Sequence, residues 1–307
     1  MIDLHSDTIY ALWRKGDDGE SLLSNELVLS KDKLLGAGIT GQCFALFTPL
    51  KEGNPWRIVN ELHERFLKET ELSDIPVYTG HEDLRKGLHA ILTTEEGGSI
   101  EGDISRLEIL RSWNVKIFGF TWNYENELGY PNSTDPDVMD KPLKDKGIEA
   151  LYECERLGII ADVSHLNDGG FYSIARHARK PFIATHSDCR AITDVSRNLK
   201  DDQIRIIADK GGVVGFNICW AFLEREGTPE RTSRIADMAA HIMHMYEVGG
   251  EDVLAFGSDF DGTGGKLELD SPEKIPLVKD ALKREGLSER IIDKLFLDNA
   301  LRVLESC

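Results

Sequence analysis

Short runs of β-branched and aromatic residues alternate along the chain with longer stretches in which apolar residues recur at helical spacing. Runs of the first kind are typical of buried strands, and the stretches between them are typical of helices that pack on a sheet. Eight strands are predicted, at residues 2–6, 39–47, 89–95, 115–121, 158–164, 181–186, 212–218 and 253–258. This alternation predicts an α/β fold with parallel strands and crossover helices.

The amphipathic stretches predict helices at 54–71, 143–157, 200–210 and 232–248, and two more, 272–286 and 288–305, follow the last strand. Eight strands close a (β/α)₈ TIM-type barrel, and C-terminal helices at about 272–305 fit its closure. An open doubly wound sheet is the alternative, although no Gly-x-Gly-x-x-Gly follows the first strand. No repeat or linker divides the chain, so residues 1–307 are predicted to form a single barrel domain.

The charge balance narrows the expected partners. The chain has 54 acidic and 36 basic side chains and a formal net charge of −18, which repels phosphate backbones and argues against nucleic acid. Residues 1–30 show no basic segment followed by an apolar core, and no apolar run approaches the ~18 residues of a membrane span. We therefore expect a cytoplasmic protein without a membrane partner.

The cysteines do not suggest a disulfide framework. They are odd in number and show no Cys-x-x-Cys spacing, at Cys43, Cys154, Cys189, Cys219 and Cys307. Reduced thiols are therefore predicted, and a thiolate zinc site is not.

Histidines and carboxylates stand where the predicted strands end, at His5, Asp7, Glu95, His165, His186 and Asp259. In a barrel these strand ends open on one face, and the period of two puts His5 and Asp7 on the same side of their strand. Imidazoles and carboxylates suit a borderline cation such as zinc, and six candidates exceed the needs of one tetrahedral metal. A single strand-end histidine or aspartate is often structural, but the whole set predicts two metals, bridged by a carboxylate and a shared water.

Six motifs, in this order, resemble the membrane (renal) dipeptidase family, the M19 metallopeptidases. They are Asp3-Leu4-His5-Ser6-Asp7, Glu95-Glu96-Gly97-Gly98, Asp162-Val163-Ser164-His165, Thr185-His186-Ser187, Ser196-Arg197-Asn198-Leu199 and Gly257-Ser258-Asp259-Phe260-Asp261-Gly262. The resemblance implies a (β/α)₈ barrel that holds two zinc ions per subunit and hydrolyses dipeptides. It also implies a homodimer as the expected assembly.

The resemblance also implies a role for each matching residue. His5 and Asp7 look like ligands of the first zinc, Glu95 like the bridging carboxylate, and His165 and His186 like ligands of the second. Arg197 is similar to the arginine that receives the substrate carboxylate, for which a guanidinium is well suited. Asp259 is similar to the aspartate that contacts the substrate amine. Glu95 or Asp259 would be the nearest carboxylate to carry a proton to the leaving nitrogen.

The motifs leave the bridging glutamate open and differ from the family at one position. The spacing to the next strand favours Glu95 as the bridging residue, whereas the Glu-Gly-Gly signature read literally favours Glu96, and adjacent strand residues face opposite ways. Trp122 stands where well-known family members carry a histidine, and indole offers one N–H donor and no charge. Oxyanion stabilisation would then fall on the zinc ions or on Asn123, while Trp122 packs the barrel mouth at the substrate.

Four further polar residues receive a secondary interpretation. His241 and His244 share a face of a predicted helix, but barrel helices lie outside, so a structural role is expected. Asp188 and Asp261 lie near the predicted site and are expected to orient its ligands.

The predicted activity is zinc-dependent hydrolysis of dipeptides through a metal-bridging water, with tolerance of a C-terminal D-residue left open. One alternative is another binuclear metal-dependent amidohydrolase acting on a small anionic amide, although such barrels usually open with His-x-His and this chain has His5-x-Asp7. The other alternative is a non-catalytic metal-binding protein, which a His165→Ala variant with unaltered zinc content would support.

Overall fold

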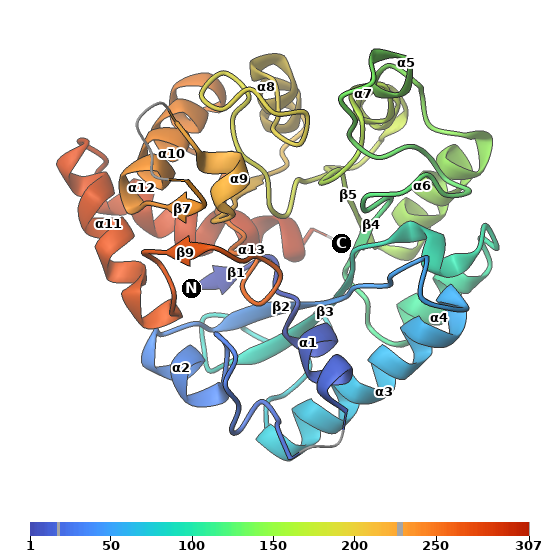
Figure 1. Cartoon of the computed structure of the whole chain (residues 1–307), viewed down its shortest axis with the longest axis horizontal. Helices are drawn as coiled ribbons and strands as arrows, with labels where there is room; N and C mark the ends of the chain where they lie inside the picture. The colour runs from blue at the N-terminus through green and yellow to red at the C-terminus, as the bar shows by residue number, and fades with distance from the viewer. Residues whose placement is uncertain (17–18, 226–229, 307) are drawn as a thin grey trace.

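Parallel strands curl into a closed barrel with helices around it in the computed structural model (Figure 1), which describes residues 1–16, 19–225 and 230–306. Five neighbouring strands pair in chain order: β1 (Ile2–Asp3), β2 (Gly41–Leu46), β3 (His89–Thr94), β4 (Ile117–Gly119) and β5 (Ile160–Asp162). Two further barrel strands, β6 (Val214–Phe216) and β8 (Leu254–Phe256), pair with each other in parallel. The (β/α)₈ barrel predicted from the sequence is thereby confirmed.

Single bridges close the barrel where regular pairing stops. Ile183 bridges to Asp162 at the end of β5, and Ala184 bridges to Val214 in β6, so residues 183–184 fill the place between these strands. On the other side, the Leu4 backbone N–H donates to the Phe256 carbonyl oxygen at 2.9 Å, which joins β1 to β8. Within residues 1–16, 19–225 and 230–306 the barrel is therefore complete, with seven regular strands and one bridging segment.

Helices follow the strands and cover the outside of the barrel (Figure 1). Within the described residues they are α1 (Thr8–Lys15), α2 (Lys31–Gly36), α3 (Pro55–Ser73), α4 (Arg106–Ser112), α5 (Pro136–Met139), α6 (Asp145–Leu157), α7 (Asp168–His177), α8 (Asp201–Asp209), α9 (Trp220–Leu223), α10 (Ile235–Gly249), α11 (Ile275–Arg284), α12 (Glu289–Asp293) and α13 (Asn299–Leu304). Short 3₁₀ turns cover Gly97–Ile100 and Pro272–Lys274, and a π-helical turn, Lys294–Asp298, joins α12 to α13.

The barrel interior is packed with apolar side chains below the strand ends. A buried cluster takes residues from each barrel segment, namely Ile2, Cys43, Ile91, Ile117, Ile160, Ile183, Val213 and Ala255. Ala300, Leu301 and Leu304 of α13 belong to the same cluster, so the C-terminal helix closes one end of the barrel. Polar residues that continue the inward-facing pattern must then emerge at the opposite, C-terminal end of the strands.

The strands expected at 2–6, 115–121, 158–164, 212–218 and 253–258 are only two or three residues long in the structure, and three other elements differ more. The strand expected at 181–186 forms only the two bridges, because the Thr185 N–H donates to Asp162 Oδ1 at 2.9 Å and the His186 N–H donates to Ser164 Oγ at 3.2 Å. The helix expected at 232–248 begins at Ile235, because Thr232–Ser233 form β7, which pairs with β9 (Lys266–Leu267). The helix expected at 288–305 is divided by the π-helical turn.

No helix within the described ranges is long and apolar enough to cross a membrane. The four described cysteines are free thiols, as the sequence predicted, and three of them are buried. Cys307 lies outside the described residues.

Candidate metal centre

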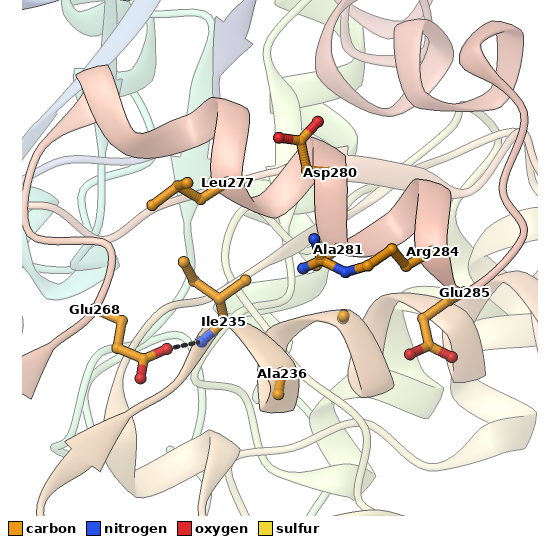
Figure 2. Close-up of a pocket in the computed structure, with 9 residues that line it drawn as sticks. Ile235, Ala236, Glu268, Leu277, Asp280, Ala281, Arg284 and Glu285 are labelled. Atoms are coloured by element: carbon orange, nitrogen blue, oxygen red, sulfur yellow. Dashed lines mark hydrogen bonds between the residues drawn. The ribbon is translucent and has the colours of Figure 1, made fainter.

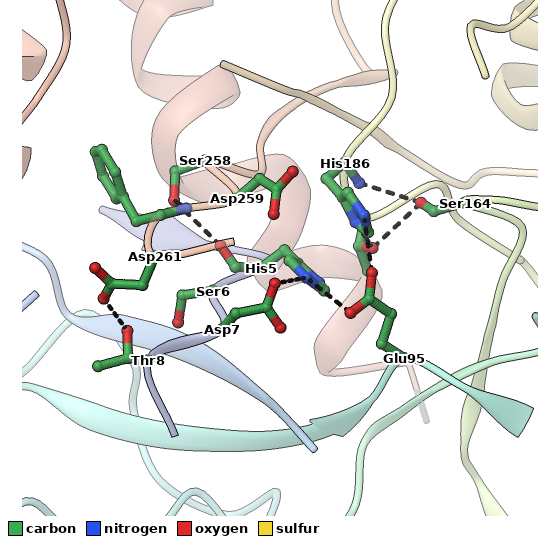
Figure 3. Close-up of polar contacts among 12 residues, drawn as sticks. His5, Ser6, Asp7, Thr8, Glu95, Ser164, His186, Ser258, Asp259 and Asp261 are labelled. Carbon is green, nitrogen blue, oxygen red and sulfur yellow. Dashed lines mark hydrogen bonds and ion pairs between the residues drawn. The ribbon is translucent and has the colours of Figure 1, made fainter. Parts of the chain in front are cut away.

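The predicted ligand residues lie together at the C-terminal ends of the barrel strands, and Figure 3 shows four of them, His5, Asp7, Glu95 and His186. His5 and Asp7 follow β1, Glu95 follows β3, and His165 and His186 follow β5 and the bridging segment. All five residues are buried, with exposed fractions of 8% or less. The barrel closure brings them together although nearly 180 residues separate the first from the last.

Glu95 lies at the centre of this group. Its Oε1 is 3.1 Å from His165 Nε2 and 3.5 Å from His186 Nε2, and its Oε2 is 3.7 Å from His5 Nε2. The second carboxylate, Asp7, has its Oδ2 3.8 Å from His5 Nε2. One carboxylate oxygen therefore faces two histidines and the other faces His5, as a bridging ligand between two cations would require.

The two neighbouring glutamates point in opposite directions. Glu95 continues the inward face of β3 that includes Ile91, whereas Ala90 and Leu92 belong to the outer core between barrel and helices. Glu96 instead accepts hydrogen bonds from Gly98 N at 2.6 Å and Trp122 N at 2.9 Å. The geometry therefore brings Glu95, and not Glu96, to the other ligand-type residues.

Several buried atoms of the group have no hydrogen-bond partner within the described residues. They are His5 Nε2, Asp7 Oδ1 and Glu95 Oε2. Buried polar atoms are normally satisfied, and two of these three, His5 Nε2 and Glu95 Oε2, face each other across 3.7 Å. Two sets of ligand atoms are close enough to hold an ion, namely His5 with Glu95 and His186, and His5 with Asp7 and Asp259. This donor set fits a divalent metal.

The electrostatics of these five residues also favour the binding of a cation between them. Burial raises the pKa of Glu95 well above its usual range, and the neighbouring Asp7 raises it further. Burial lowers the pKa values of His165 and His186 well below their usual range, so both imidazoles are neutral. Burial lowers the pKa of His5 as well, but the carboxylates of Glu95 and Asp7 outweigh this effect and raise it to about 10. A bound cation would favour the ionised carboxylates and neutral imidazoles that ligation requires.

Hydrogen bonds behind the histidines orient their rings. Thr185 Oγ1 donates to Asp162 Oδ2 at 2.5 Å and lies 2.8 Å from His186 Nδ1. Because the hydroxyl proton is directed to the carboxylate, the Thr185 oxygen is left to accept from Nδ1–H, and Nε2 of His186 carries the lone pair. His165 Nδ1 lies 3.3 Å from Asn123 Oδ1 in the same manner. Both Nε2 atoms are thereby presented to Glu95.

We expect Thr185→Val to weaken metal binding by about 10- to 100-fold, the usual effect of losing a partner behind a metal-binding histidine. Valine has a similar shape but cannot accept from His186 or donate to Asp162. Thr185→Ser keeps the hydroxyl and should retain most of the affinity. Chelator competition measures the dissociation constant directly, and an unchanged constant in the valine variant would contradict this arrangement.

Sequence reasoning missed Asp3 and Asp162. Asp3 accepts from Ser258 Oγ at 2.6 Å and Ser258 N at 2.9 Å, and so fixes the end of β8 beside β1. Both aspartates lie inside buried strand runs, an unfavourable place for a carboxylate without partners. An aspartate inside a buried strand run was therefore the feature of the sequence that could have identified both residues.

Asp259, Asp188 and Asp261 reach the site through different contacts. Asp259 adopts a left-handed backbone with φ of 62° and accepts from Asn217 Nδ2 at 3.1 Å. Asp188 accepts from Asn217 N at 3.3 Å, so it supports Asp259 only indirectly. Asp261 accepts from Thr8 Oγ1 at 2.6 Å and Val28 N at 2.7 Å, which ties the loop after β8 to the N-terminal segment.

Arg197 is buried behind the metal centre. Its Nη1 donates to Ser187 Oγ and its Nη2 to the His186 carbonyl oxygen, both at 2.7 Å. Its Nε has no partner within the described residues. The ring of Phe222 lies 5.3 Å from the guanidinium carbon.

A cavity of about 410 Å³ opens over the centre. It is lined by Asp7, Tyr10, Phe47, Glu95, Trp122, Asn123, His165, Cys219, Phe222, Asp259, Asp261 and Gly262. Arg197 is not part of this lining, whereas Cys219, which sequence reasoning left unassigned, is. A Cβ at Gly262 would lie 2.1 Å from Asp7 Oδ2 and 2.4 Å from Asp259 Oδ1, so only glycine lets both carboxylates approach.

A second cavity, of about 440 Å³, lies between α10 and α11 (Figure 2). Ile235, Leu277, Asp280 and Arg284 are part of its lining, and Glu268 Oε2 accepts from Ile235 N at 2.8 Å. None of the predicted ligand residues lines this cavity.

His241 and His244 hold helices together. His244 Nε2 lies 2.7 Å from Asp201 Oδ1, and His241 Nδ1 accepts from Cys189 N at 3.0 Å. Burial lowers the pKa of His241 to about 3. The Asp237 carboxylate opposes this shift, and the Arg225 guanidinium adds to it. His241 therefore stays neutral in the folded protein at pH values where the unfolded chain binds a proton.

His241 should thus make the protein less stable as the pH falls. Its pKa is about 3 when folded and 6.5 in the reference state, so the unfolded state gains protons first and stability falls below about pH 6.5. Between pH 7 and pH 5 the free energy of unfolding should decrease by about 2 kcal/mol more in wild type than in His241→Gln. Urea unfolding at both pH values measures this, with exposed His81→Gln as control, and equal decreases would contradict it.

Comparison with known proteins shows which family has this sequence pattern and fold. The family model described as membrane dipeptidase, peptidase family M19, matches residues 1–307. A metallopeptidase from Rhodobacter sphaeroides, solved with a phosphinate mimic of the dipeptide L-Ala-D-Ala, has a TM-score of 0.90 at 24% identity and covers 99% of this chain and 98% of its own. Dipeptidase AC, a metallopeptidase of family M19, has a TM-score of 0.87 at 25% identity, with coverages of 99% and 97%.

Among sequence relatives, an uncharacterised protein in the pqqA 5′ region of Klebsiella pneumoniae is 34% identical over 227 residues. This alignment covers 72% of the present chain and 83% of the Klebsiella protein.

Proposed function

The chain belongs to the membrane dipeptidase family, peptidase family M19, and on this basis we propose that it hydrolyses dipeptides at a centre of two zinc ions. The observation that carries the proposal is the position of Glu95, whose two carboxylate oxygens face His165 and His186 on one side and His5 on the other.

His5, Asp7 and Glu95 would hold the first ion, and Glu95, His165 and His186 the second. Bound zinc supplies a nucleophile at neutral pH by lowering the pKa of water, and it polarises the substrate carbonyl. The chain's own residues order this site. Thr185 and Asn123 fix the histidine rings, and Gly262 leaves room for the Asp7 and Asp259 carboxylates.

Residues around the centre would read both ends of the substrate. Arg197 donates to Ser187 Oγ and to the His186 carbonyl oxygen beside the cavity, and its unpartnered Nε would donate to a C-terminal carboxylate. Asp259 Oδ2 accepts from Asn217, which leaves Oδ1 to accept from the substrate amine. Glu95 or Asp259 would carry a proton to the leaving nitrogen, since these are carboxylates at the cavity floor.

The proposed activity is tested by release of free amino acids from L,L and L,D dipeptides, with metal-stripped protein compared to protein given two equivalents of zinc. Zinc-dependent cleavage of dipeptides, but not of tripeptides or N-acetylated dipeptides, is expected. The L,D peptides are included because the Rhodobacter protein was solved with an L-Ala-D-Ala mimic. Cleavage of N-acetylated dipeptides at equal rates would contradict the role of Asp259.

The cytoplasmic location and the homodimer expected from the sequence remain part of this proposal. Gel filtration at micromolar concentration tests the dimer.

A further inference from the structure

One side of the cavity above the metal centre is an aromatic wall made of Tyr10, Phe47 and Trp122. Its rings contact one another edge to face: the ring centroids of Tyr10 and Phe47 are 4.8 Å apart at 88°, and those of Phe47 and Trp122 are 4.7 Å apart at 65°. Such contacts hold aromatic side chains in fixed orientations. The wall is therefore a preformed apolar surface beside the reacting centre.

Trp122 is supported from behind and half-buried. Its backbone N–H donates to Glu96 Oε2 at 2.9 Å, and the Tyr124 ring packs against its indole with centroids 5.7 Å apart. Lys51 Nζ lies 3.8 Å above the ring of Tyr124 and holds it in turn. These contacts leave the indole as a cavity wall and not as a free surface side chain.

The charged residues of the cavity already have partners or a proposed metal. Asp261 accepts from Thr8 and Val28, Asp259 accepts from Asn217, and Asp7 and Glu95 belong to the metal centre. No lysine or arginine is among the described residues that line the cavity. A substrate side chain that lies against the aromatic wall therefore meets apolar surface, with no basic residue of the lining to pair with an acidic side chain.

We propose that the aromatic wall is the subsite for a substrate side chain, and that Trp122 makes the enzyme prefer dipeptides with a large apolar or aromatic residue. This inference rests on the proposed dipeptidase activity. Indole has one N–H and no charge, so its contribution to an oxyanion is small, whereas an aromatic side chain of this size buries about 150–250 Å². Contact area, and not hydrogen bonding, is what Trp122 offers.

The preference is measured as the ratio of kcat/KM for dipeptides with Phe or Leu at either position to that for Ala-Ala. A ratio of at least about tenfold is expected in the wild-type enzyme, since a few methylene groups in an apolar pocket discriminate to this degree. In Trp122→Ala the ratio should fall toward 1, mainly through a higher KM for the large substrates. Trp122→Phe keeps a ring and should keep most of the ratio.

Trp56→Ala is the matched control, because Trp56 is also partly buried but stacks on Trp113 and does not line the cavity. Its ratio should equal that of wild type. A wild-type ratio near 1, or a ratio unchanged in Trp122→Ala, would overturn the subsite. A preference for Lys-containing dipeptides would also overturn it, because the carboxylates would then govern selection.

A binding measurement tests the substrate side-chain subsite independently of the proposed dipeptidase activity. Reduced-bond analogues, in which CH₂–NH replaces the peptide group, bind without being cleaved, and calorimetry gives their dissociation constants with zinc-loaded protein. Equal constants for wild type and Trp122→Ala overturn the subsite alone. Binding that depends on Trp122, together with no hydrolysis of any dipeptide, supports the subsite and overturns the dipeptidase activity alone.

Discussion

Glu95→Gln should lose zinc and at least about 1,000-fold in kcat/KM for dipeptides. Metal ions contribute several kcal/mol of transition-state stabilisation, and each 1.36 kcal/mol is a factor of ten. An amide offers one neutral oxygen where Glu95 turns two charged oxygens toward His5 and the pair His165 and His186. Bound metal after dialysis and dipeptide hydrolysis are the measurements.

The adjacent glutamate is a matched control. Glu96 accepts from Gly98 N, Trp122 N and Asn126 Nδ2, so Glu96→Gln places an NH₂ group opposite one of three donors. This variant should lose about 1–3 kcal/mol of stability but keep its zinc. Metal-free Glu95→Gln should be no less stable than metal-free wild type, because it removes a buried carboxylate beside Asp7. If Glu96→Gln lost its zinc while Glu95→Gln kept it, Glu96 and not Glu95 would be the metal ligand.

Arg197→Met should lower kcat/KM for dipeptides about 100-fold and leave zinc content unchanged. The guanidinium is buried and is held by Ser187 and the His186 carbonyl oxygen. Removing one partner of a buried hydrogen-bonded charge pair costs about 2–5 kcal/mol. Hydrolysis of dipeptides is compared with hydrolysis of their C-terminal amides, and the preference for the free acid should disappear in this variant.

Arg190→Met is the corresponding control, since the Arg190 guanidinium pairs with Asp168 at 2.9 Å. It should reduce stability without changing the preference for free acid over amide. An Arg197→Met enzyme that still prefers the free acid would show that another group receives the carboxylate.

The sequence predicts much of this centre because strand periodicity and barrel geometry act together. Glu95 lies four residues after Ile91, an even number, so an inward-facing isoleucine in the barrel core predicts an inward-facing Glu95. The common orientation of parallel strands then brings His5, His165 and His186 to the same end. These inferences require only the strand positions.

Other features depend on contacts that a linear pattern does not contain. The segment 181–186 has the composition of a strand, yet side chains of Asp162 and Ser164 take its backbone N–H groups and limit it to two bridges. Asn123, which the sequence places at the substrate, lines the cavity, and its Oδ1 also lies 3.3 Å from His165 Nδ1, a contact that the sequence does not reveal. Short helices such as α5 and α9 have only four residues each and are fixed by packing, not by periodicity.

The central claim is that Glu95 bridges two metal ions, and anomalous diffraction at the zinc edge from crystals of zinc-loaded protein tests it most directly. We predict two peaks about 3.5–4 Å apart, one beside His5 and Asp7 and the other beside His165 and His186, with the Glu95 carboxylate between them. A single peak, or peaks that Glu95 does not contact, would contradict the account.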